Sequence, residues 1–86
     1  MQPHKRETWT VEYGELTEDV RMSYYRGYWD GNEPAMDEYD VPAGTTVRIV
    51  MVSRFGDVGI TEKLDREAGY GKRLDISKLT NLRKVL

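Results

Sequence analysis

A run of apolar and β-branched residues constrains the fold of this chain more than any other feature. Residues 46–53 place Val47 and Ile49 on one face of an extended segment and Val50 and Val52 on the other. A strand with apolar residues on both faces is typical of the inside of a sheet, because both faces must then be covered. The run therefore predicts a central strand, with other strands on each side of it.

Other segments carry the same signal in weaker form. Residues 9–13 and 20–29 alternate apolar and polar side chains with the period of a half-buried strand, so we expect a strand in each. Residues 14–19 are predicted to form the turn between them. Asp30-Gly31-Asn32 is a predicted turn after the second strand, because these residue types tolerate positive φ angles. The polar residues 33–40 are expected to form a long loop.

The second half of the chain adds further short strands. Residues 58–61 and 70–74 are predicted strands, and residues 55–57 form a tight turn before the first of them. Residues 63–68 are open to two interpretations, a single helical turn closed by Gly69 or a loop. Short strands separated by frequent turns are typical of a small antiparallel sandwich or barrel.

The C-terminal segment predicts a departure from strand geometry. Apolar residues recur every three positions from Ile76 to Leu82, which is the spacing of a 3₁₀ turn, where side chains at i and i+3 eclipse. We therefore expect one such turn near residues 77–81, followed by a short edge segment that reaches the last residue. An α-helix over residues 77–84, with Ser77 as its N-cap, is the competing interpretation.

Composition predicts a soluble protein with one domain. The 86 residues are enough for one modest core, and we expect a single domain over residues 8–86 behind a flexible tail of residues 1–7. The first residues are basic without an apolar run after them, so no signal peptide is predicted, and no apolar window is long enough to span a membrane. We expect a cytoplasmic location, which the absence of cysteine also fits.

The residue types that catalysis and metal binding need are sparse. The chain has no cysteine, and its single histidine, His4, lies in the predicted tail. A catalytic triad or a zinc site needs more of these side chains than the chain supplies. The spacing of the carboxylates selects neither a calcium site nor a catalytic pair. We therefore expect no enzymatic activity, no metal and no cofactor.

Charge is distributed unevenly along the chain. Residues 1–43 contain ten acids and four bases, a net charge of −6, whereas residues 44–86 contain nine bases and five acids, a net charge of +4. On one interpretation the two halves attract each other weakly across the surface of one domain. On the other, the acidic half presents a face to a basic partner.

The order of these segments resembles that of SH3-like small barrels. Met22-Ser23-Tyr24-Tyr25-Arg26-Gly27-Tyr28 is similar to the aromatic first strand of that family, and the acidic residues 30–40 are similar to its long RT loop. Val41-Pro42-Ala43-Gly44-Thr45 resembles the diverging turn that leads into a central strand. Gly56-Asp57-Val58-Gly59-Ile60 is similar to a later hairpin, and residues 77–82 lie where the family has its 3₁₀ turn.

This resemblance covers residues 20–86. It implies an all-β fold, a small antiparallel SH3-like barrel with residues 9–13 as an extra N-terminal strand and a 3₁₀ or helical turn near the C-terminus. Two features depart from the peptide-binding members of the family. Ser53-Arg54-Phe55 stands where they carry a tryptophan pair, and the 3₁₀ segment lacks their proline and tyrosine. The small size, high charge and single-domain format also resemble orphan proteins of bacteriophages and mobile elements.

The strongest candidate site is the mixture of aromatic and acidic residues within residues 20–40. Tyr and Trp dominate protein interfaces, because they bury a large area with little loss of side-chain entropy. Alternation puts Tyr24 and Tyr28 on one face of the strand and Tyr25 and Trp29 on the other, so we expect one pair to face solvent or a partner. The predicted partner-binding residues are Tyr25, Trp29, Asp30, Glu33, Asp37, Glu38 and Tyr39.

We therefore expect a non-enzymatic protein–protein interaction module that binds a basic or Pro/Arg-bearing segment of another protein, such as a host protein. The alternative is nucleic-acid binding by the basic second half, with Tyr70 nearby for base stacking. A net charge of −2 disfavours that alternative, because phosphate binding depends on excess positive charge. The residues that would carry it are Arg54, Lys72, Arg73, Lys78, Arg83 and Lys84.

Overall fold

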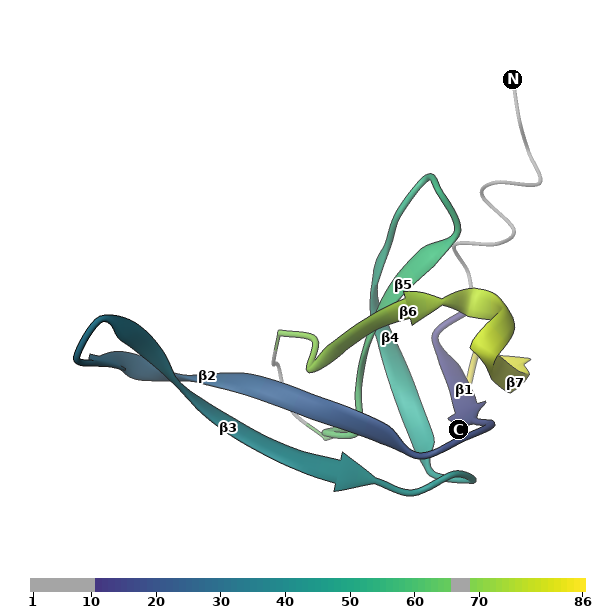
Figure 1. The fold of residues 1–86 in the computed structure, drawn as a ribbon. Coiled ribbons are helices and arrows are strands. Elements are labelled where there is room, and N and C mark those ends of the chain that lie inside the picture. Colours follow the sequence, from purple (N-terminus) through teal and green to yellow (C-terminus); the bar gives the residue numbers. More distant parts are fainter. Residues whose placement is uncertain (1–10, 66–68) are drawn as a thin grey trace.

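The computed structural model describes residues 11–65 and 69–86, and these form an all-β fold of two antiparallel sheets (Figure 1). Five strands make a curled half-barrel sheet, namely β1 (Tyr13–Leu16), β4 (Thr46–Val52), β5 (Asp57–Thr61), β6 (Lys72–Asp75) and β7 (Leu79–Arg83). The second sheet is a long hairpin of β2 (Val20–Asp30) and β3 (Glu33–Val41). One 3₁₀ turn, η1 (Ile76–Lys78), is the only helical element of the described residues.

Strand β4 lies in the middle of the five-stranded sheet, whose order is β6-β5-β4-β1-β7. Its neighbours run antiparallel to it, with Ile49 opposite Ile60 of β5 and Val47 opposite Gly14 of β1. Val47 and Ile49 are buried and the other residues of β4 are half-buried, as a central strand requires. The prediction of a central strand from this run is confirmed.

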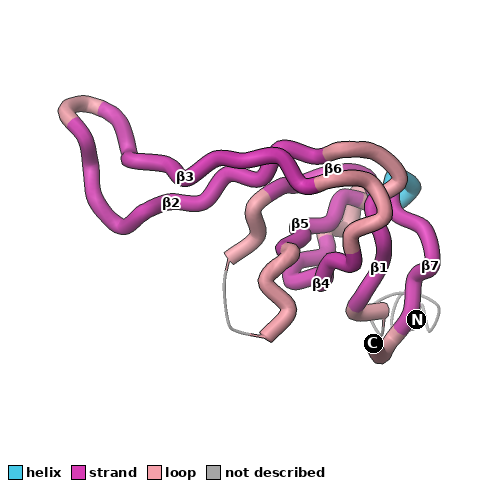
Figure 2. The backbone as a smooth tube through the Cα atoms, turned by 90° about the horizontal axis from the view of Figure 1, so that it is seen from below, coloured by secondary structure: helices cyan, strands magenta, loops and turns pink. Residues whose placement is uncertain are grey.

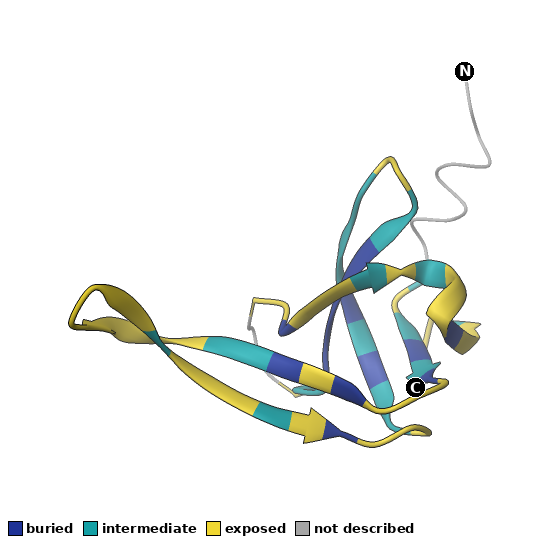
Figure 3. Ribbon diagram, viewed as in Figure 1, coloured by how far each residue is buried: buried dark blue, intermediate teal, exposed yellow. Residues whose placement is uncertain are grey.

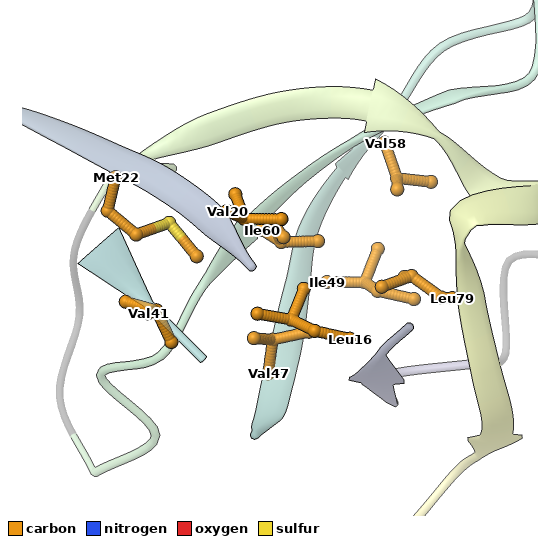
Figure 4. Close-up of a cluster of buried hydrophobic side chains, with 9 residues drawn as sticks. All are labelled: Leu16, Val20, Met22, Val41, Val47, Ile49, Val58, Ile60 and Leu79. Carbon is orange, nitrogen blue, oxygen red and sulfur yellow. The ribbon is translucent and has the colours of Figure 1, made fainter. Parts of the chain in front are cut away.

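The core fills the space between the curled sheet and the base of the β2–β3 hairpin (Figure 4). Val20 and Met22 of β2 and Val41 of β3 are buried against apolar side chains of the sheet. The hairpin is therefore held to the sheet only where it begins and ends. The core consists of Leu16, Val20, Met22, Val41, Val47, Ile49, Val58, Ile60 and Leu79.

The β2–β3 hairpin, which we call the arm, extends well beyond the sheet on which its base packs (Figures 1 and 2). From Tyr25 to Asp30 every residue of β2 is exposed, and the facing part of β3 is exposed except for Ala35, which is half-buried (Figure 3). The strand register shifts between Tyr25 and Trp29, where Gly27 adopts a φ of 95°. We call residues 25–36 the distal arm.

The arm corrects one prediction from the sequence. Residues 33–40, expected to form a loop, are strand β3, because the turn at Gly31 (φ 68°) sends the chain straight back along β2. A polar strand that contains Pro34 is tolerated here since β3 is an edge strand, where a missing N–H breaks no ladder. The predicted strand at residues 20–29 is confirmed as β2, but it belongs to the arm rather than to the curled sheet.

The first strand of the curled sheet is β1, which lies between β4 and β7. Gly14 and Glu15, expected in a turn, are part of it, and their pairing with β4 and β7 provides hydrogen bonds that a turn would not. Residues 1–10, which include His4, the predicted tail and the first two residues of the predicted N-terminal strand, lie outside the described residues. Of the rest of that predicted strand, residues 11 and 12 precede β1 and Tyr13 begins it. The segment 63–68 was predicted to be either a helical turn or a loop, and its residues 66–68 also lie outside the described residues.

The C-terminal segment confirms the predicted 3₁₀ turn and shows the competing α-helix to be wrong. The turn spans Ile76–Lys78, and strand β7 begins directly after it. Its N-cap is Asp75, not Ser77: the Asp75 carboxylate accepts a hydrogen bond from the Ser77 backbone N–H at 2.9 Å. That backbone hydrogen bond holds the pKa of Asp75 below its ordinary value.

Candidate functional site

The distal arm exposes four large apolar side chains to solvent. The exposed fractions are 54% for Tyr25, 53% for Tyr28, 63% for Trp29 and 40% for Met36. Tyr25 stands opposite Met36 in the strand register, and Trp29 stands opposite Pro34. Because directly opposed residues share a face of a hairpin, these pairs form apolar steps along the arm. The exposed surface of these four side chains contributes little to the packing of the core.

Tyr28 and Met36 extend the site beyond the residues predicted from the sequence. Alternation grouped Tyr28 with Tyr24, which is half-buried at the base of the arm. The two tyrosines differ in burial because the arm leaves the sheet at Tyr25, so that no other element among residues 11–65 and 69–86 covers Tyr28. Periodicity assigns residues to faces but does not show where a hairpin runs past the end of its sheet.

The predicted acidic residues of the arm are all exposed. Asp30 and Glu33 are opposite each other beside the turn, and Asp37 and Glu38 lie farther along β3. Arg21 pairs with two carboxylates on the outer face, at 3.3 Å from Asp40 and 3.9 Å from Glu38. Across residues 20–41 five acids face only two bases, so the arm carries negative charge.

Tyr39, by contrast, does not lie with the other predicted residues. It is half-buried at the base of the arm, where its ring lies 6.1 Å from that of Tyr24 on β2. Both phenols donate hydrogen bonds to one carboxylate, that of Glu62, which follows β5. We call Tyr24, Tyr39 and Glu62 the tyrosine clamp.

The clamp joins both strands of the arm to the curled sheet. The Tyr24 hydroxyl lies 2.6 Å from Glu62 Oε1 and 2.7 Å from Thr61 Oγ1, and the Tyr39 hydroxyl donates to Glu62 Oε2. The ammonium of Lys63 sits 3.9 Å from the centroid of the Tyr24 ring, a cation–π contact. Both oxygens of one carboxylate are therefore occupied, and the base of the arm has a fixed position.

The clamp shifts the pKa of each of its members. Burial, together with the hydrogen bond to Glu62, raises the pKa of Tyr24 from 10.0 to about 12 and raises that of Tyr39 as well. Burial also opposes ionisation of Glu62, but the hydrogen bonds from the two phenols outweigh it and hold the pKa of Glu62 below its ordinary value. At neutral pH the clamp is thus one carboxylate and two neutral phenols.

The contact between the arm and the loop before β6 depends on a glycine. The backbone N–H of Ser23 donates to the carbonyl oxygen of Gly71 at 2.8 Å, and Gly71 donates to the carbonyl of Ile60 at 2.8 Å. A Cβ atom on Gly71 would lie 2.5 Å from Cζ of Tyr24. No sequence signal singled out Glu62 or Gly71, because each acts only through partners brought together by the fold.

The six basic residues of the alternative site come from several different elements. They lie on β6, in η1, on and after β7, and in the turn after β4, and β6 and β7 are the opposite outer strands of the sheet. Three of them pair with carboxylates: Arg73 with Asp57 at 3.4 Å, Lys78 with Glu18 at 3.9 Å, and Arg83 with Glu15 at 3.2 Å. The positive charge of these three residues is therefore partly neutralised by neighbouring carboxylates.

In residues 11–65 and 69–86 no group of three or more His, Cys, Asp or Glu side chains is placed to hold a metal ion. The same residues contain no helix with the length and apolar character needed to cross a bilayer. Comparison with protein-family models, with curated proteins and with solved structures gave no match for this chain.

Proposed function

We propose that this protein is a non-enzymatic protein–protein interaction module whose distal arm binds a basic or Pro/Arg-bearing segment of another protein. The observation that carries the proposal is the projecting hairpin, whose large aromatic side chains are exposed and contribute little to the core. The proposed contact residues are Tyr25, Tyr28, Trp29 and Met36, with the acidic residues Asp30, Glu33, Asp37 and Glu38 around them.

The physical argument starts from the weakness of an isolated hairpin. A two-stranded hairpin is marginally stable in water unless a third strand or another surface covers one face. The distal arm nevertheless carries Tyr25, Tyr28 and Trp29, the residue types that dominate interface hot spots. Large apolar side chains left exposed on one segment often mark an interaction site. The arm is therefore best explained as one side of an interface.

Charge narrows the class of partner. The carboxylates of the arm attract a basic segment, raise its rate of encounter and disfavour acidic competitors. The pairs of Arg21 with Glu38 and Asp40 are solvent-exposed, so they are weak and a partner's cation can replace Arg21. Tyr39 acts in this proposal by positioning the arm through the clamp rather than by touching the partner.

The assignment to the SH3-like barrels is also part of the proposal. It is supported by the order of the elements: a long acidic hairpin, a turn into a central strand, and a 3₁₀ turn directly before the last strand. This scheme departs from the alignment suggested by the sequence, because β1, and not residues 22–28, is taken as the first strand of the barrel, and the arm takes the place of the RT loop. The core under the arm, from Val20, Met22 and Val41, is consistent with that arrangement.

The experiment that tests the function is a pull-down from host lysate with the tagged chain and its Tyr25→Ala/Trp29→Ala variant, each with and without nuclease. We expect a protein that the wild type retains after nuclease treatment and that the variant loses. Phe55→Ala is a matched control, because Phe55 is also an exposed aromatic residue but lies in the turn after β4. Recovery that depends on nucleic acid and survives the aromatic substitutions would instead support the basic residues as the site.

A further inference from the structure

Strand β3 has one open edge. In the described residues β3 pairs only with β2, and no backbone hydrogen bond from β3 reaches any other element. The opposite edge of the arm is different, because the Ser23 N–H of β2 donates to Gly71. The outward N–H and C=O groups of an edge strand form a template on which another strand can pair.

The side chains along this open edge have a defined order. Met36, Glu38 and Asp40 lie opposite Tyr25, Ser23 and Arg21 and share the outer face of the arm, since opposed residues share a face. On the other face lie Asp37 and Tyr39. A strand added beside β3 would place its own residues next to these, one after another.

Like charges exclude one candidate for that strand. A second copy of the chain adding its own β3 would set carboxylates against carboxylates, which destabilises a strand pair. Charge on edge strands commonly serves to block such pairing between copies. A basic segment avoids this repulsion between like charges. Strand β3 contains four acids and no base, so the cations of such a segment would face opposite charges.

We propose that β3 recognises a basic, extended peptide segment by strand addition. This inference rests on the proposed function and names its binding mode. An apolar residue of the segment stands opposite Met36, and basic residues stand opposite Asp37, Glu38 and Asp40. If the segment runs antiparallel to β3, its residues from the N-terminus to the C-terminus are therefore basic, any residue, basic, basic and apolar. If it runs parallel to β3, the order is the reverse.

The test uses synthetic peptides that carry Lys-Thr-Lys-Arg-Leu and the reversed order, titrated onto the full chain and followed by fluorescence anisotropy. Two modified versions of each carry backbone N-methyl groups on alternate residues, one on the odd and one on the even positions. Only alternate amides of an added strand point toward β3. We expect one N-methylated version to lose affinity about tenfold or more and the other to bind as well as the parent.

Two variants of the protein probe the other side of the contact. Asp37→Asn/Glu38→Gln should weaken the unmodified peptide about tenfold, whereas Glu12→Gln, an exposed acid outside the arm, should leave affinity unchanged. Equal binding by both N-methylated versions would overturn strand addition, as would failure of every peptide to bind. If the pull-down still depends on Trp29 in either case, the proposed function stands and only this binding mode is wrong.

Discussion

At the residue scale, the carboxylate of Glu62 determines how the arm is mounted on the sheet. It accepts hydrogen bonds from Tyr24 of β2 and Tyr39 of β3, and thereby ties both strands of the arm to the end of β5. Hydrogen bonds to a charged group are stronger than neutral ones, and the two phenols favour the charged form of the Glu62 carboxylate. The clamp is therefore cooperative, and removal of one member affects the other two.

Glu62→Ala should lower the free energy of unfolding by about 2 kcal/mol, because two half-buried phenols lose their acceptor. Urea denaturation followed by fluorescence measures this change. Glu12→Ala is the matched control, since Glu12 is exposed and its substitution should change stability by less than about 0.5 kcal/mol. Equal stability of the Glu62→Ala variant and the wild type would mean that the clamp does not hold the arm.

The clamp also predicts a pH dependence. The pKa of Tyr24 is raised from 10.0 to about 12 in the fold, so the neutral phenol contributes stability below pH 10.0 that is lost as the pH rises through about 12. The pKa of Glu62 is lowered, so its contribution is present above its ordinary value of 4.5 and is lost as the pH falls through the folded value.

Unfolding free energies measured across the alkaline and acid ranges test this dependence. Tyr24→Phe/Tyr39→Phe removes both phenols, so this variant should lose the alkaline fall in stability that the clamp causes. If the free energy of unfolding fell equally in the variant and the wild type at alkaline pH, groups other than these two phenols would cause the fall.

At the element scale, the close approach of β2 to the loop before β6 fixes the direction in which the arm leaves the sheet. Gly71→Ala should lower the free energy of unfolding by about 2 kcal/mol, because the added methyl group displaces the Tyr24 ring from its site. Gly69→Ala is the control, since a Cβ atom there meets nothing within 4 Å. Thermal unfolding of the two variants gives the comparison, and similar melting temperatures would contradict the packing described here.

The arm itself divides into a base that stabilises the fold and a distal part that does not. Tyr25→Ala/Trp29→Ala should therefore change the free energy of unfolding by less than about 0.5 kcal/mol, as for exposed positions in general. Met22→Ala, at a fully buried position of the same strand, should lower it by about 3 kcal/mol. If the aromatic double variant were as unstable as Met22→Ala, the aromatics would belong to the core.

Local patterns predicted the elements better than their arrangement. The central strand β4, the strand β2 and the 3₁₀ turn follow from periodicity and turn chemistry, which depend on neighbours in sequence. Strand β3 was missed because its polar side chains and Pro34 suit an edge strand that faces solvent, which local pattern does not separate from a loop. The hydrogen bond of Tyr39 in the clamp was missed for a different reason: its partner, Glu62, lies 23 residues away in the chain.

At the scale of the whole molecule, the uneven charge of the chain separates two kinds of surface. The acidic first half supplies the arm, whereas four bases of the second half lie on strands of the curled sheet, namely Arg48, Lys72, Arg73 and Arg83. Three bases of the second half pair with acids of that sheet and its turns. Two of these pairs, Lys78 with Glu18 and Arg83 with Glu15, join the two halves as the first interpretation expects, whereas the interpretation that the acidic half faces a partner stays a prediction. The arm is the part where the acids outnumber the bases.

The most direct test of the partner-binding arm is site-specific photo-cross-linking in host lysate. A photoreactive benzophenone side chain placed at Trp29 should give a discrete protein adduct that an excess of untagged wild-type chain suppresses. The same side chain at Phe55, which is 77% exposed in the turn after β4, should give no such adduct. Adducts of the same kind from both positions, or none from Trp29, would contradict the proposal that the arm binds another protein.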